Sequence, residues 1–152
     1  MLTQELIEPS DTKTYSFVPP DEGTYWYHSH YISHEQVARG MMGALIVEDE
    51  TPPDVDHDIT VLMVDWQMLE DGRLSDKFAD MHSVAHGGYM GNFARAFLSQ
   101  DQVKTGDRVR LRLINVATNR IFPVAMGGVS GSLVASMAWP WPSLVRWKTL
   151  SS

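Results

Sequence analysis

The sequence predicts an all-β chain, because short strand-like runs recur along it and turn signals separate them. The clearest run is residues 108–113, where arginine and apolar residues alternate strictly. No internal repeat of solenoid length is present. Many short strands joined by frequent turns favour a β-sandwich or barrel.

The first third of the chain is expected to hold three strands and a short helix. Alternation and aromatic residues indicate the first two strands, and a nearly continuous apolar run indicates a third that is buried on both faces. The helix is one or two turns long and ends at Gly40, because glycine tolerates the left-handed cap conformation. The strands are expected at 12–18, 24–28 and 42–48, and the helix at 33–39.

A linker is expected at residues 50–58, since the stretch around it contains Pro52-Pro53 and acidic residues and almost nothing apolar. We place a domain boundary there. Beyond it, strands are expected at 59–64, 108–113 and 121–126, turns at 70–73 and 105–107, and mostly loop at 76–100.

The alternating strand has two different faces. Its apolar face carries Val109, Leu111 and Leu113, and its other face carries a row of arginines. Side chains two residues apart on a strand share a face, so we expect the arginine row to be solvated. That row is Arg108, Arg110 and Arg112.

The C-terminal segment, residues 135–152, differs from the rest. It contains three of the five tryptophans together with Pro140 and Pro142, and no strand or helix period fits it. No acidic residue follows Asp107. We expect a tail foreign to the fold, such as a frameshift or a truncated gene would produce, with an ordinary Trp-rich segment as the alternative.

Composition excludes several classes of protein. A net charge of -7 argues against nucleic-acid binding, which requires a basic surface. The longest apolar run, 40–47, is too short to span a membrane, and the first residues do not have the pattern of a signal peptide. The absence of cysteine excludes disulfides, zinc–thiolate sites and a blue-copper site.

His28 and His30 are the candidate metal ligands. Residues two apart on a strand point to the same side, so the two imidazoles should lie next to each other. Neutral imidazole suits copper and zinc. Two histidines cannot close a site, so further ligands would have to come from elsewhere. Taken alone, the pair is either half of a metal site or a chance pair on a half-exposed strand.

The sequence around this pair resembles the first cupredoxin domain of multicopper oxidases, and a later strand is similar to the opening of that family's second domain. The resemblance runs from about Leu2 to Val134. It rests on GTYWYHSH at 23–30, EQVARG at 35–40, GALIVE at 43–48, RVRLRLIN at 108–115 and NRIF at 119–122.

The resemblance implies a cupredoxin-like Greek-key β-sandwich fold present in two parts. Residues 1–49 would be the C-terminal half of the first domain, and residues 59–134 the N-terminal part of the second. Two incomplete sandwiches would leave strand edges and apolar faces exposed.

The resemblance also implies a role for the histidines. The family has four copper motifs, which bind one blue copper and a three-copper cluster. The His-x-His here is similar to the second motif, so His28 and His30 would each bind one copper of the cluster's dinuclear pair. The other three motifs do not occur in the sequence. The chain then resembles a fragment of an oxidase that couples one-electron oxidation of a reductant to reduction of O2 to water, and is inactive alone.

The implied cofactor is copper, and the implied partners are the missing cupredoxin domains or a second copy of the chain. Two alternatives remain open: a non-catalytic copper-binding or scaffold module, and a truncated gene product without function. Members of the family are typically periplasmic or extracellular, which applies only to a parent protein.

Other histidines are weaker candidates. His82 and His86 are four residues apart with Met81 and Met90 nearby, which permits either a soft copper site on a helix or solvated loop residues. His34 is expected to be a packing or surface residue, and His57 to be exposed in the acidic stretch.

Overall fold

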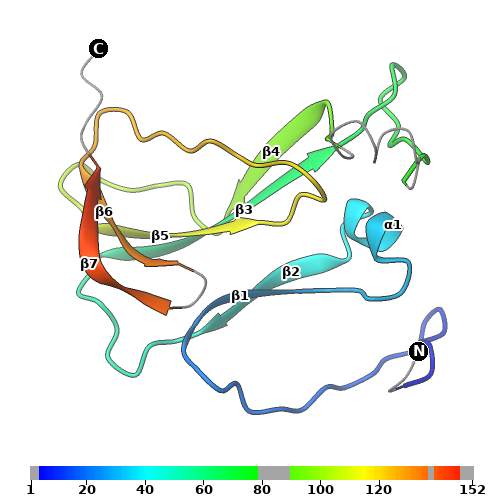
Figure 1. The fold of residues 1–152 in the computed structure, drawn as a ribbon, viewed down its shortest axis with the longest axis horizontal. Coiled ribbons are helices and arrows are strands. Elements are labelled where there is room, and N and C mark those ends of the chain that lie inside the picture. The colour runs from blue at the N-terminus through cyan, green and yellow to red at the C-terminus, as the bar shows by residue number, and fades with distance from the viewer. Residues whose placement is uncertain (1–3, 79–89, 137–138, 148–152) are drawn as a thin grey trace.

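The structure is a computed structural model that describes residues 4–78, 90–136 and 139–147. Within these ranges the regular elements are strands and one short helix, which confirms the predicted all-β class (Figure 1). The elements are β1 Gly23–His28, α1 Ser33–Ala38, β2 Met42–Val47, β3 His57–Trp66, β4 Phe93–Leu98, β5 Val109–Asn115, β6 Gly131–Ser136 and β7 Trp139–Trp147.

The strands form three small sheets. β1 pairs with β2, β3 lies between β4 and β5, and β6 pairs with β7. β3 is antiparallel to β4 and parallel to β5, and the other two pairs are antiparallel. Figure 1 shows β1–β2 beside the three-stranded sheet, with the β6–β7 hairpin at one end.

The first sheet and the helix agree with the expectations from sequence. β1, α1 and β2 occupy the expected positions, and Gly40 after the helix has a φ of +92°. Gly43 lies opposite Tyr27, and a Cβ added at Gly43 would come within 2.5 Å of the Tyr27 Oη. The tyrosine ring therefore lies across the glycine. β2 is half-buried rather than buried on both faces, so that expectation was wrong.

Two predicted strands are absent from the described residues, and three strands, β4, β6 and β7, were not predicted. Residues 12–18 and 121–126 are irregular, because neither run pairs with a strand among the described residues. β4 lies in a stretch expected to be loop. Its sequence, FARAFL, has no alternation of apolar and polar residues, and all six residues are exposed. It is a strand because it pairs with β3.

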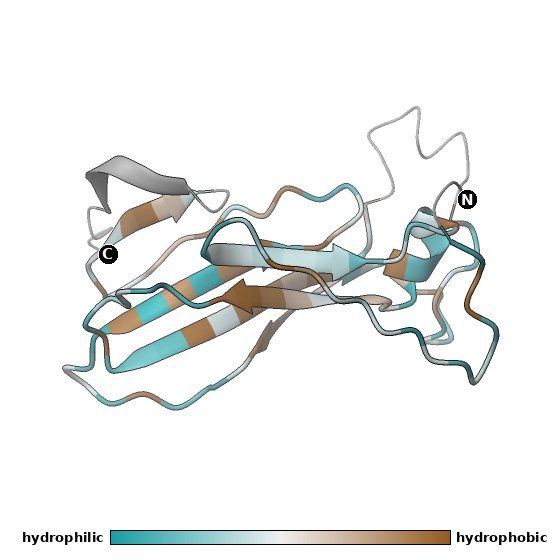
Figure 2. Cartoon of the chain, turned by 90° about the horizontal axis from the view of Figure 1, so that it is seen from below, coloured by the Kyte–Doolittle hydropathy of each residue, from teal (hydrophilic) through white to brown (hydrophobic). Residues whose placement is uncertain are grey.

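The hydrophobic core of the described residues lies between the first sheet and the second. Val64 of β3, Ile114 of β5 and Val116 are buried together, with Met42 and Ile46 of β2 packed against them. Viewed from below, brown and teal alternate along the strands, as expected for sheets with unlike faces (Figure 2). This core therefore joins the part of the chain before the acidic stretch to the part after it.

Two of the three arginines in the row, Arg110 and Arg112 of β5, are not solvated, which corrects the expectation from sequence. Arg112 is 6% exposed, whereas Leu111 and Leu113 on the other face are each 39% exposed. The alternation was correct but the assignment of its faces was wrong, because acidic residues near the sheet supply counter-charges for the arginines.

Arg112 makes three hydrogen bonds. Its Nε and Nη2 donate to the two carboxylate oxygens of Asp58, each at 2.8 Å. Its Nη1 donates to Thr24 Oγ1 at 2.8 Å. Since Asp58 lies on β3 and Thr24 on β1, one buried guanidinium connects both sheets.

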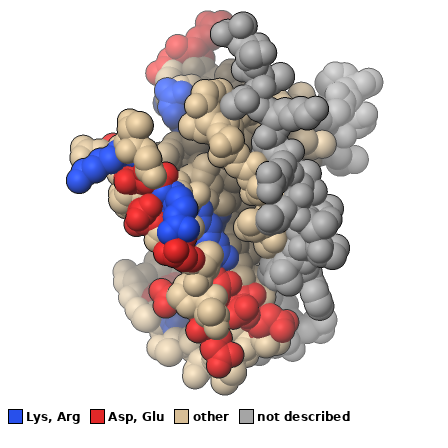
Figure 3. Space-filling view, turned by 90° about the vertical axis from the view of Figure 1, so that its left-hand side faces the viewer, with Lys and Arg blue, Asp and Glu red and all other residues tan. Residues whose placement is uncertain are grey.

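Arg110 and Arg108 are progressively more exposed than Arg112. Arg110 pairs with Asp49, and this bond lowers the pKa of the Asp49 carboxyl below its ordinary value. Arg108 pairs with Asp54 in solvent. Figure 3 shows acidic and basic side chains intermixed at this end of the molecule.

No helix among the described residues is long and apolar enough to cross a membrane. The Trp-rich segment that fitted no period contributes β7, which pairs with β6.

Replacing the buried arginine should destabilise the fold far more than replacing its exposed neighbour. Arg112→Met removes the hydrogen bonds to Asp58 and Thr24, and because the Asp58 side chain is 37% exposed and can be hydrated, we expect the free energy of unfolding to fall by about 2 kcal/mol. Arg108→Met removes only a surface ion pair and should cost less than about 1 kcal/mol. Urea unfolding of both variants at one chain concentration tests this, and equal losses would contradict it.

Candidate functional site

The two predicted ligands lie together. His28 is the last residue of β1, and His30 follows in the connection to α1. Their rings are stacked, with centroids 4.9 Å apart and planes 28° from parallel. His28 is half-buried and His30 is exposed. The expectation that spacing by two places the imidazoles side by side is confirmed.

The local backbone holds the pair where the strand ends. His28 lies opposite Met42 in the β1–β2 register, and the Ser29 N–H donates to the Met41 carbonyl at 3.2 Å. The Tyr31 N–H then donates to Ser29 Oγ, which turns the chain toward α1. His30 therefore stays near the strand although it lies beyond its last residue.

One nitrogen of His28 has a defined partner. His28 Nδ1 lies 3.0 Å from the Ser29 carbonyl oxygen. A carbonyl can only accept a hydrogen bond, so Nδ1 carries the proton when the ring is neutral. The lone pair is then on Nε2, and a metal ligand needs such a lone pair. Backbone carbonyls commonly fix metal-binding histidines in this way.

The two imidazoles of His28 and His30 fit copper as part of the ligand set of a metal centre. Imidazole nitrogens suit copper, and the His28 ring has the tautomer required. Among the residues that the structure describes, no three His, Cys, Asp or Glu side chains gather into a metal-sized group. Two imidazoles are too few to close a site, so any further ligands must come from outside the described residues.

The other predicted candidates that the structure describes add no ligand to this pair. His34 is exposed on α1, as expected of a surface residue. Met90 is exposed. His82, His86 and Met81 lie outside the described residues.

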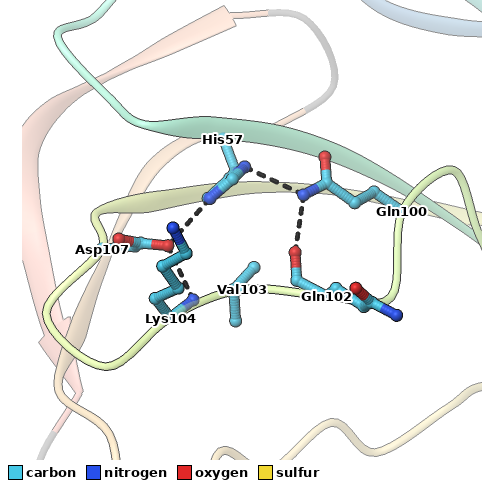
Figure 4. Close-up of a pocket in the computed structure, with 6 residues that line it drawn as sticks. All are labelled: His57, Gln100, Gln102, Val103, Lys104 and Asp107. Atoms are coloured by element: carbon cyan, nitrogen blue, oxygen red, sulfur yellow. Dashed lines mark hydrogen bonds and ion pairs between the residues drawn. The ribbon is translucent and has the colours of Figure 1, made fainter.

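His57 belongs to a cluster that sequence reasoning missed. It is half-buried at the start of β3 rather than exposed, which corrects the expectation. Gln100 Nε2 donates to its Nδ1 at 3.0 Å, so the ring's Nε2–H donates to Asp107 Oδ2 at 2.9 Å (Figure 4). These residues, with Gln102, Val103 and Lys104, line a pocket of about 430 Å³.

Parallel pairing explains why sequence gave no signal for this cluster. His57 lies beside Val109 in the β3–β5 register, which brings the preceding turn against the ring. The partners are separated by about fifty residues, and no local spacing marks such a contact.

Asp107 also fastens its own turn. Its Oδ2 accepts the Lys104 N–H at 2.7 Å. This backbone hydrogen bond and, second, the bond from His57 lower the pKa of Asp107 below its ordinary value of 3.8. The carboxylate is therefore a structural acceptor that stays charged in mildly acidic solution.

Acid should remove the contribution of Asp107 to stability. Because its folded-state pKa is lowered, the contribution is complete above about pH 3.8 and is lost as the pH falls through the folded value. Asp107→Asn should therefore lower the urea midpoint at pH 5, and its difference from the unmodified chain should shrink toward pH 2.5. Asp101→Asn, at an exposed position of the same loop, is the control. A difference that grows on acidification would contradict this.

Comparison with known proteins identifies the fold. The structure of Lac15 from a marine microbial metagenome superposes with a TM-score of 0.76, at 46% identity, over 97% of this chain and 37% of that one. A family model described as multicopper oxidase matches residues 1–52. The fold is a cupredoxin-like β fold of the kind found in multicopper oxidases.

Curated relatives give the same family. A laccase of Botryotinia fuckeliana is 27% identical over 146 residues, and an iron transport multicopper oxidase of Kluyveromyces lactis is 40% identical over 86 residues. The matches cover 89% and 55% of this chain. The chain belongs to the multicopper oxidase family and is laccase-like. It spans 32% of the first relative and 13% of the second, so it covers only part of such proteins.

Proposed function

We propose that the chain is a segment of a laccase-like oxidase that supplies His28 and His30 to a copper centre whose other ligands lie outside it. The stacked imidazole pair carries this proposal. The bond from His28 Nδ1 to a backbone carbonyl supports it, because that bond leaves Nε2 as the donor atom toward a metal. The lack of cysteine argues that no blue-copper site belongs to this segment.

The residues of this chain would bind copper and orient its ligands. They would not carry out the redox reaction alone. When bound, copper supplies one-electron chemistry, and a cluster of coppers supplies the four electrons needed to reduce O2 to water. His28 and His30 would each hold one metal at a fixed place on a strand end. Electron entry from the reductant would require the missing ligands, so we expect the isolated chain to be inactive as an oxidase.

The proposal includes a division of the chain. Residues 1–49 would be the C-terminal half of one cupredoxin domain, 50–58 a linker, and 59–134 the N-terminal part of another. The exposed apolar side chains of the second sheet support this, because a complete sandwich would cover them. They include Phe97, Leu98, Leu111 and Leu113. The tail at 135–152 would lie outside the native sandwich.

Copper titration tests the ligand assignment. We expect the chain to bind Cu(II) weakly, and His28→Ala or His30→Ala to weaken that binding further, by at least about tenfold. His34→Ala is the matched control, since it removes an exposed imidazole just beyond the pair. Calorimetry gives the dissociation constants. Equal binding by all four proteins, or none by any, would contradict the assignment. Tight binding by a dimer would instead favour the non-catalytic copper-binding module.

The exposed apolar faces lead to a prediction about assembly. The isolated chain should be marginally stable or self-associate, because among the described residues no layer covers the exposed apolar side chains of its second sheet. Sedimentation across a range of concentrations, followed by calorimetric melting, checks this. A monomer that melts cooperatively would contradict the division into two incomplete domains.

A further inference from the structure

We propose that Trp26 is a positioning residue for the histidine pair, and that its indole fixes the plane of the His28 ring from which the metal is bound. This rests on the proposed function of His28 and His30. Trp26 and His28 are stacked with ring centroids 4.4 Å apart and planes 21° from parallel. His28 and His30 continue the stack.

The strand period places two of the three rings. Trp26 and His28 are two residues apart on β1, so they share one side of the strand. His30 lies beyond the end of β1, where the turn at Ser29 and Tyr31 keeps its ring against that of His28. Two residues of strand rise about 6.6 Å, which places the neighbours of His28 toward opposite ends of the strand. The His28 ring therefore lies within a column, with an indole on one side and the second imidazole on the other.

The stack restricts a motion that the hydrogen bond leaves free. The bond from Nδ1 to the Ser29 carbonyl fixes which edge of the ring faces the backbone. A ring held by one hydrogen bond can still tilt about it, and tilting would swing Nε2 away from a metal. A flat indole against the ring face removes that freedom.

Trp26 is placed for this role rather than for the hydrophobic core. It is 38% exposed and is not among the residues of the core cluster. Its cross-strand partner is Ala44, a small residue that leaves room for the indole. A metal-bound imidazole is electron-poor, and an indole face attracts positive charge, so the stack should also strengthen on binding.

Three variants of the whole chain test the inference. Trp26→Leu keeps apolar bulk but removes the ring, and Trp26→Phe restores a ring face. Tyr27→Leu is the control, since Tyr27 is an exposed aromatic residue on the opposite side of the same strand. We expect Trp26→Leu to weaken Cu(II) binding about tenfold, with Trp26→Phe recovering most of it and Tyr27→Leu matching the unmodified chain.

A copper-free measurement separates this inference from the proposed function. In ¹³C relaxation measurements without copper, the His28 ring should be equally rigid in the unmodified chain and in Trp26→Phe, and more mobile in Trp26→Leu, while the Nδ1 proton bonded to the Ser29 carbonyl stays in place in all three. If Trp26→Leu keeps both the rigidity of the ring and the copper affinity, the positioning role is overturned even where His28→Ala abolishes binding. If no protein binds copper, the proposed function fails and the rigidity of the His28 ring alone decides about Trp26. Equal losses in Trp26→Leu and Tyr27→Leu would show a general strand effect and overturn the inference.

Discussion

The arrangement of the two sheets depends on the buried guanidinium of Arg112. A buried charge is tolerated only when it is paired and its donors are satisfied, and here Asp58 takes two bonds and Thr24 a third. Arginine suits this place because its planar fork matches a carboxylate with two parallel bonds. Because Asp58 and Thr24 lie on different sheets, satisfying this one charge fixes how the sheets approach each other.

The interface between the sheets has polar contacts at two places and apolar packing between them. The first polar place is the set of Arg112 hydrogen bonds, and the apolar packing is made by Val64 and Ile114. The second polar place lies near α1, where the Trp66 indole N–H donates to the Ala38 carbonyl at 2.9 Å. Thr24 lies on the same side of β1 as His28. The bond that holds Thr24 to the second sheet therefore also sets where the histidine end of β1 lies, although it touches neither imidazole.

Sequence patterns predicted the elements that rest on local interactions. β1, α1 and β2 follow from aromatic content, apolar runs and a glycine cap, and the spacing of two predicted that the His28 and His30 rings lie side by side. β4 and the His57 cluster could not be predicted, because each exists only through pairing with distant segments. The faces of β5 were reversed for a related reason: alternation shows that two faces differ, but which one is buried depends on the acidic residues brought beside it.

The distinction between local contacts and contacts with distant segments also applies to the copper site. This segment can supply the orientation of two ligands, but it cannot supply the complete ligand set. The orientation of the histidine pair uses contacts made within residues 26–42, namely the ring stack, the Ser29 carbonyl, the turn at Tyr31 and the bond from Ser29 to the Met41 carbonyl. Such contacts do not require the rest of a larger oxidase. A closed metal site needs more ligands than two imidazoles, and these would come from other parts of such a protein. Ligand orientation is thus a property of this strand end, whereas metal affinity and redox chemistry would be properties of the assembly that completes it.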